Sequence, residues 1–118
     1  MKEHLYWYRC KYDPTNPAYD ADTLRLWVDL GLNIWIHGQI FRLTDIDAWE
    51  VRGEERPLGL LARDALREKL ESEKEIYINT RQDRKGKYGR YLADLYLDGQ
   101  LINNWLVEAG HAIEKDYA

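Results

Sequence analysis

The chain has 118 residues, of which 45% are hydrophobic, and this is enough for one core, so we expect a single domain over residues 1–118. The net charge of −4 argues against a uniformly basic nucleic-acid binder, and the single cysteine rules out an internal disulfide framework. No apolar run is long enough to span a membrane. Met1-Lys2-Glu3-His4 lacks a signal-peptide pattern, so we expect a cytoplasmic protein, monomeric by default, although a secreted form trimmed of its leader would look the same.

Short strands dominate the first half of the chain. Aromatic-rich or alternating runs predict strands over residues 5–12, 24–28, 32–36 and 40–47. Between them we expect turns at residues 13–17, at Asp29-Leu30-Gly31 and at His37-Gly38. Closely spaced strands of this kind indicate a small barrel or a sandwich.

The stretch from Phe41 to Glu50 begins as a strand and ends in charged residues. Alternation predicts Phe41 and Leu43 on one face, and Arg42, Thr44 and Ile46 on the other. Asp47 and Glu50 follow at the polar end. Carboxylates can hold a hard metal ion or move a proton, and an arginine can grip a phosphate. Taken alone, these ten residues favour a solvated strand end.

An amphipathic helix is predicted to begin at Pro57. Its apolar stripe is Leu58, Leu61, Ala62, Ala65, Leu66 and Leu70, and its opposite face carries Arg63, Asp64, Arg67, Glu68 and Glu71. We expect this helix to pack on the core. Strands over residues 75–81 and 88–97 follow, then an Asp98-Gly99 turn, a short helix capped by Gly110, and a tail over residues 111–118.

Positive charge gathers between the last two predicted strands. Residues 81–90 hold five basic side chains and one acidic side chain, a local charge of +4 that leaves −8 for the rest. This segment is either a patch that steers a charged ligand or a basic hairpin loop that maintains solubility.

Three separated motifs resemble those of the staphylococcal nuclease (thermonuclease) family. They are Asp20-Ala21-Asp22-Thr23, then Arg42 followed by Asp47 and Glu50, then Lys87-Tyr88-Gly89-Arg90. None is specific alone, but their order and the elements between them match the family from about Tyr19 to Gly110.

The resemblance implies a mainly β, α+β fold, namely a five-stranded oligonucleotide-binding (OB) barrel with a long helix and a short C-terminal helix. It also implies a Ca²⁺-dependent phosphodiesterase that acts on DNA or RNA, single-stranded or frayed, and leaves 3′-phosphate and 5′-hydroxyl ends. On this reading the site residues divide into three groups. They are the metal ligands Asp22, Asp47 and the carbonyl of Ala48, the catalytic residues Arg42, Glu50 and Arg90, and the substrate-binding residues Lys87 and Tyr88.

Two departures bear on the implied site. Ala21 replaces a glycine of the first motif, which would strain the corner if it required a positive φ. Trp49 stands where the family has proline, so it either frees the loop before Glu50 or pins it by packing. The alternative function is a catalytically weak or inactive barrel that binds single-stranded nucleic acid or a protein.

Overall fold

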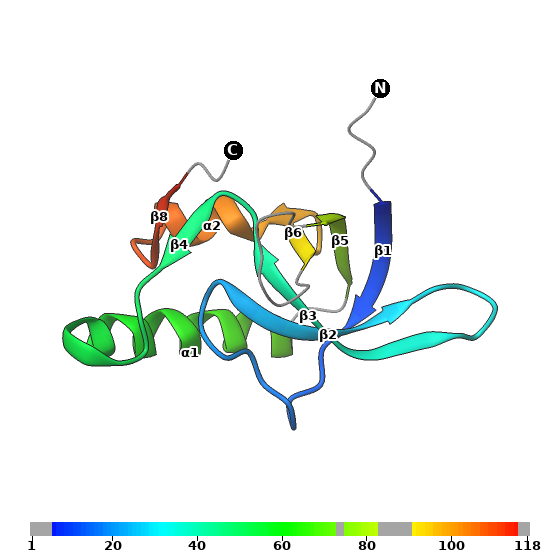
Figure 1. Cartoon of the computed structure of the whole chain (residues 1–118), viewed down its shortest axis with the longest axis horizontal. Helices are drawn as coiled ribbons and strands as arrows, with labels where there is room; N and C mark the ends of the chain where they lie inside the picture. The colour runs from blue at the N-terminus through cyan, green and yellow to red at the C-terminus, as the bar shows by residue number, and fades with distance from the viewer. Residues whose placement is uncertain (1–5, 73–74, 83–90, 116–118) are drawn as a thin grey trace.

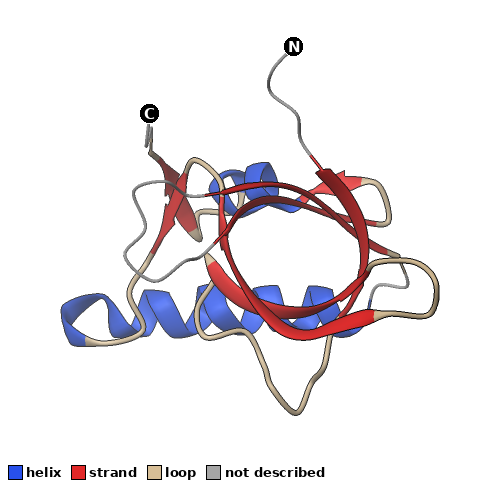
Figure 2. Ribbon diagram, turned by 45° about the vertical axis from the view of Figure 1, so that its right-hand side comes forward, coloured by secondary structure: helices blue, strands red, loops and turns tan. Residues whose placement is uncertain are grey.

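The structure, a computed structural model, describes residues 6–72, 75–82 and 91–115, but only the backbone of residues 81 and 82. Five strands of the described chain close into a barrel in the order β3-β2-β1-β5-β6 (Figures 1 and 2). They are β1 (Tyr6–Lys11), β2 (Thr23–Asp29), β3 (Trp35–Leu43), β5 (Ile76–Gln82) and β6 (Tyr91–Leu97). Neighbouring strands are antiparallel except β3 and β6, whose parallel pairing closes the barrel. The predicted five-stranded barrel is confirmed.

Inward-facing aliphatic side chains fill the barrel, as strand alternation requires. In β2, for example, Leu24, Leu26 and Val28 are buried while Arg25 between them is exposed. Cys10 of β1 is also buried, and this burial, followed by the nearby charge of Asp29, raises the pKa of its thiol to about 12. The thiol therefore stays protonated and serves as a core group.

The turn predicted at His37-Gly38 is wrong, because β3 runs through both residues without a break. Gly38 has a φ of +70°, and the pairing of β2 with β3 shifts register between Leu26 and Val28. A glycine in the left-handed region accommodates such a β-bulge within a strand. The turn predicted at Asp29-Leu30-Gly31 is present but lies slightly later, between Leu30 and Ile34, where the Leu30 N–H donates to the Ile34 carbonyl at 2.9 Å. The strand predicted over residues 32–36 therefore begins only at Trp35.

The strand predicted over residues 40–47 is divided in the structure. β3 ends at Leu43, the chain turns at Thr44 and Asp45, and β4 (Ile46–Ala48) follows. Asp45 takes a φ of 57°, which reverses the chain. Ile46 is therefore buried in the core, and the prediction that it shares a face with Arg42 is wrong.

The long helix α1 (Arg56–Ser72) follows a short 3-10 turn, η1 (Gly53–Glu55), and lies along one side of the barrel (Figure 1). Its predicted apolar stripe is only partly correct. Ala62, Leu66 and Leu70 are buried, but Leu58 and Leu61 are exposed and Gly59 is buried instead. The first turn of α1 therefore contacts the rest of the domain through its backbone at Gly59 rather than through leucine side chains.

The C-terminal part is more ordered than predicted. β7 (Gln100–Leu101) pairs with β6, and α2 (Ile102–Glu108) ends before Gly110, whose φ of +81° confirms the predicted cap. The predicted tail instead contains β8 (Ala112–Glu114), which pairs with β4. No helix of the described residues is long and apolar enough to cross a membrane.

Candidate active site

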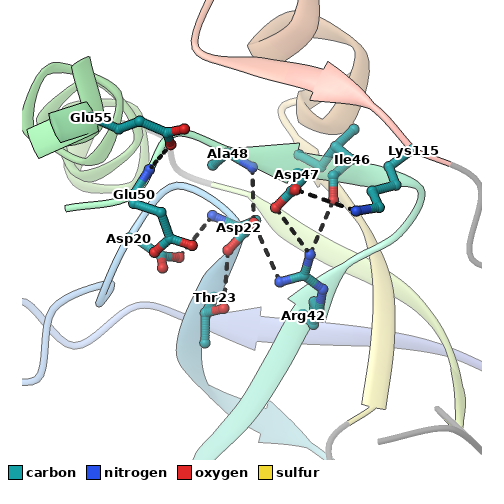
Figure 3. A network of polar contacts seen from close by, with 10 residues as sticks. All are labelled: Asp20, Asp22, Thr23, Arg42, Ile46, Asp47, Ala48, Glu50, Glu55 and Lys115. Atoms are coloured by element: carbon teal, nitrogen blue, oxygen red, sulfur yellow. Dashed lines mark hydrogen bonds and ion pairs between the residues drawn. The ribbon is translucent and has the colours of Figure 1, made fainter. Parts of the chain in front are cut away.

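The guanidinium of Arg42 lies between two carboxylates that are far apart in the sequence (Figure 3). Its Nη1 is 3.3 Å from Oδ2 of Asp22, and its Nη2 is 3.5 Å from Oδ1 of Asp47. The same Nη2 lies 3.4 Å from the Ile46 carbonyl. Arg42 is the penultimate residue of β3, Asp47 lies in β4, and Asp22 directly precedes β2, so three separate segments converge on this group.

Asp22 is a buried carboxylate with only 3% of its surface exposed. The Ala48 N–H donates to its Oδ2 at 2.9 Å, and the Thr23 hydroxyl donates to its Oδ1 at 3.1 Å. The backbone carbonyl of Asp22 accepts the Leu43 N–H at 2.8 Å, which links the corner formed by residues 20–23 to the end of β3. Burial is tolerated because both carboxylate oxygens accept hydrogen bonds and Arg42 supplies the opposite charge.

The substitution at Ala21 does not strain this corner. Ala21 is fully buried and does not belong to the described residues with a positive φ. The corner is held by an isolated bridge between Asp20 and Thr23 and by the Asp22 N–H, which donates to Oδ1 of Asp20 at 3.1 Å. The missing glycine therefore leaves the position of Asp22 intact.

Asp20 carries the largest electrostatic perturbation of the site. Burial, followed by hydrogen bonding with Asp22 and repulsion from its charge, raises the pKa of Asp20 from the ordinary 3.8 to about 7. Two carboxylates in one corner are difficult to ionise together, and a cation nearby would relieve this. The sequence motif alone does not indicate this burial of Asp20 beside Asp22.

Lys115 is a site residue that the sequence analysis missed. Its Nζ lies 3.8 Å from Oδ2 of Asp47, whereas Arg42 contacts the other carboxylate oxygen, Oδ1 (Figure 3). The residue was assigned to a tail, but the pairing of β8 with β4 brings the C-terminal segment beside Asp47. Only this long-range pairing makes the lysine a neighbour, so no local signal could have identified it.

The loop that carries Glu50 is pinned by several contacts. The indole Nε1 of Trp49 donates to the Gly110 carbonyl at 2.8 Å, and the Glu50 N–H donates to the Glu55 carboxylate at 2.9 Å. A Cβ added to Gly59 would come within 1.9 Å of the Glu50 carbonyl oxygen. Trp49 thus pins the loop, and Gly59 lets helix α1 approach the backbone of Glu50.

Helix α1 also supports the corner from the other side. Nε and Nη2 of Arg67 donate to the Ala18 carbonyl at 2.9 and 2.7 Å. Arg67, which the sequence predicts on the face opposite the apolar stripe, thus contacts another segment of the domain. Because the carbonyl precedes the Asp20–Thr23 corner by two residues, this fork links the helix to the segment that positions Asp22.

A buried amide fixes the end of β3. The Nδ2 of Asn103, in α2, donates to the Thr44 carbonyl at 3.1 Å and to the Ala93 carbonyl at 3.2 Å. Its Oδ1 accepts the Leu95 N–H at 2.9 Å. Asn103 therefore joins α2 and β6 to the turn that follows Arg42, a role that its place in a helical sequence pattern does not indicate.

The predicted residues are thus partly brought together. Arg42 contacts both Asp22 and Asp47, the Ala48 N–H donates to Asp22, and Glu50 lies two residues after Ala48. Within residues 6–72, 75–82 and 91–115, no three His, Cys, Asp or Glu side chains are grouped so that they could hold a metal ion. Lys87, Tyr88 and Arg90 lie outside the described residues.

Comparison with protein families gives a match that covers both helices and the second half of the site. The family model described as staphylococcal nuclease homologue matches residues 40–118, which is more than half of the chain. The matched region begins in β3, just before Arg42, and includes both helices. No curated protein matches the sequence.

Proposed function

Because the chain belongs to the staphylococcal nuclease homologue family, we propose that it is a Ca²⁺-dependent nuclease that hydrolyses phosphodiester bonds of DNA or RNA. The observation that carries this proposal is the position of Arg42 between Asp22 and Asp47. It places a phosphate-binding group and two hard oxygen ligands in one cluster. The products expected from the family resemblance carry 3′-phosphate and 5′-hydroxyl ends.

The donor chemistry of the cluster fits a calcium ion. Asp22, Asp47 and the Ala48 carbonyl offer only oxygen ligands, the type that Ca²⁺ prefers. Burial first, and then the neighbouring Asp22, raises the pKa of Asp20, and a cation bound at the corner would favour the ionised form of this carboxyl. When bound, the ion would stabilise negative charge on the phosphate and lower the pKa of water. Among the described residues no three His, Cys, Asp or Glu side chains are grouped to hold a metal ion, so solvent and substrate would complete its coordination.

Each residue then has a defined task. We assign to Arg42 the binding of the phosphate under attack, which requires its guanidinium to leave at least one of its two carboxylates. Glu50 would accept a proton from the attacking water, whose oxygen bonds to phosphorus. The bond between phosphorus and the 5′ oxygen would break, and the 5′ oxygen would be protonated. Arg90 would bind the same phosphate, and Lys87 and Tyr88 a neighbouring nucleotide. These last three roles depend on the resemblance alone.

The decisive experiment is a cleavage assay on the purified chain. Single-stranded DNA, double-stranded DNA and RNA are each incubated with Ca²⁺ or with a chelator, and the ends of the products are identified. We expect cleavage that stops in chelator and 3′-phosphate products. If none of the three substrates is cut in a chelator-sensitive manner, the chain is not a calcium-dependent nuclease.

One observation favours a second candidate, a barrel that binds nucleic acid or a protein without efficient catalysis. Arg42 is already neutralised by two carboxylates, and Asp47 is shared with Lys115. If these pairs persist, neither the ion nor the phosphate can enter. Binding of single-stranded DNA without cleavage, unchanged by Ca²⁺, would support this candidate over the nuclease.

A further inference from the structure

The hairpin over residues 29–37, here called the arm, projects from the barrel at one end of the molecule (Figure 1). Four large aliphatic side chains lie exposed on it. Leu32 is 93% exposed, Ile34 53%, Leu30 45% and Ile36 41%. An exposed apolar patch gathered on one projecting element marks an interaction surface, since scattered single residues would need no explanation.

Folding alone does not account for the leucine at the tip. Leu32 has a φ of 55° and Asn33 a φ of 66°, a left-handed conformation in which glycine and asparagine are favoured. Leu32 therefore contributes neither buried area nor turn preference. The turn itself is well fixed, because the Gly31 N–H donates to Asp29 Oδ1 at 2.8 Å and the Ile34 N–H donates to the Gly31 carbonyl at 2.9 Å.

The chemistry of the arm changes in layers with distance from the tip. Leu30, Leu32 and Ile34 lie nearest the tip. Trp35 follows them, paired with Asp29 across the hairpin and with Nζ of Lys11 lying 4.5 Å from the centre of its ring, and the partly exposed Ile36 lies one residue beyond it. Next comes Trp27, stacked on His37 with ring centres 3.8 Å apart, and then the exposed Arg25. Aliphatic side chains, amphipathic rings and cations, in this order, match the hydrocarbon, interface and headgroup layers of a bilayer.

We propose that the arm binds an anionic lipid surface by inserting Leu30, Leu32 and Ile34 into the boundary between headgroups and acyl chains. Trp35 lies three positions after Leu32, which would span at most about 10 Å in extended chain and spans less here because Leu32 and Asn33 turn the chain; interfacial segments insert about 5–10 Å. Lys11 and Arg25 would then face the lipid phosphates. Asp29 is the one acidic residue of the arm, and its carboxylate is engaged by the Gly31 N–H.

A lipid surface fits the arm better than a second protein does. A stable protein interface buries roughly 800 Å² on each partner and has a polar rim around an apolar centre. The arm is a narrow two-stranded tip whose apolar side chains surround a turn, so it would need a deep matching groove. Lipid chains need no such complementary shape.

The test is sedimentation of the full chain with vesicles, with chelator present so that calcium cannot bridge protein and phosphate. We expect binding to vesicles of phosphatidylcholine with phosphatidylserine, and weaker binding to phosphatidylcholine alone. The informative variant is Leu32→Asn, because asparagine suits a positive φ. It should raise the melting temperature while lowering the vesicle partition coefficient at least about tenfold.

Two further variants sharpen the result. Leu61→Glu, which changes another exposed leucine, on α1, should bind vesicles as the unaltered chain does. Lys11→Glu should reduce the preference for phosphatidylserine. The proposal is overturned if the unaltered chain does not bind vesicles, or if Leu32→Asn binds vesicles as well as the unaltered chain. It is also overturned if the unaltered chain self-associates in sedimentation without vesicles and Leu32→Asn dissociates that form.

Discussion

The positive charge of Arg42 lies next to the same two carboxylates that would bind a metal ion. It lies 3.3 Å from Asp22 and 3.5 Å from Asp47, and these are the two carboxylates that we assign to calcium. A guanidinium and a divalent ion therefore compete for the same charges. This competition makes a prediction that a simple phosphate-binding arginine would not make.

We expect Arg42→Ala to lower nuclease activity by about 100–1,000-fold, because a fixed donor to the developing negative charge is lost. Calcium should nevertheless bind more tightly, since an opposing unit charge at this distance contributes on the order of 1–4 kcal/mol in partly solvated surroundings. Titration calorimetry measures the binding. Arg25→Ala, which removes an exposed arginine bonded to Asn16, is the matched control and should alter neither quantity. Unchanged or weaker calcium binding in Arg42→Ala would refute the competition.

Asp20 gives the fold a pH dependence whose sign follows from its raised pKa. Its pKa is about 7 in the folded chain against 3.8 ordinarily, so the folded state holds a proton that the unfolded state has lost between these values. The favourable contribution of Asp20 to the free energy of unfolding is therefore present in acid and is lost as the pH rises from about 4 to about 7.

Asp20→Asn should remove this dependence and raise the melting temperature mainly at pH 7 and above, because asparagine can still accept the Asp22 N–H and carries no charge. Thermal unfolding between pH 4 and 8 in chelator measures the effect. Asp13→Asn is the control, since hydrogen bonds from Thr15 lower the pKa of Asp13. Equal pH profiles for Asp20→Asn and the unaltered chain would contradict the assignment.

At the scale of elements, the contact between α1 and the Glu50 loop depends on a helical glycine. A Gly→Ala change inside a helix ordinarily stabilises a protein by about 0.5–1 kcal/mol. At Gly59 the added Cβ would meet the Glu50 carbonyl at 1.9 Å, so the backbone of the loop or the helix must move.

We therefore expect Gly59→Ala to reverse the usual sign and lower the free energy of unfolding by roughly 1–3 kcal/mol. Since the displaced segment carries Glu50, nuclease activity should fall with it. Urea unfolding and the cleavage assay measure the two effects. Leu61→Ala, on an exposed position of the same helix, should change neither by much. A stabilised, fully active Gly59→Ala would show that helix and loop are not in close contact.

At the scale of the whole molecule, one buried amide joins segments that close the barrel. Asn103 bonds to Leu95 and Ala93 of β6 and to Thr44 at the β3–β4 turn, next to the parallel pairing of β3 with β6. Its removal leaves the Leu95 N–H and the Thr44 carbonyl without their partner in the interior.

Asn103→Ala should lower the free energy of unfolding by roughly 2–4 kcal/mol, since each unsatisfied buried group costs about 1–3 kcal/mol. Asn104→Ala provides a closely matched control, because the neighbouring asparagine of the same helix is exposed. Urea unfolding of both variants measures the difference. If Asn103→Ala and Asn104→Ala lose similar amounts of unfolding free energy, helix propensity rather than the buried amide determines the effect.

Local patterns in the sequence determined most of the elements. Strand alternation, the Pro57 helix start, the Asp98-Gly99 turn and the Gly110 cap all depend on a residue and its near neighbours, so they can be predicted without the fold. The spacing of three motifs likewise indicated the family that the family model supports over residues 40–118.

Tertiary structure alone decided which groups meet. The pairing of Lys115 with Asp47, the fork of Arg67 on Ala18 and the burial of Gly59 in place of Leu58 each depend on a segment distant in the chain. His37-Gly38 resembles a turn locally, and only the partner strand makes it a bulge. Periodicity states which side chains share a face, but it does not state what that face will contact, because this depends on closure of the whole barrel.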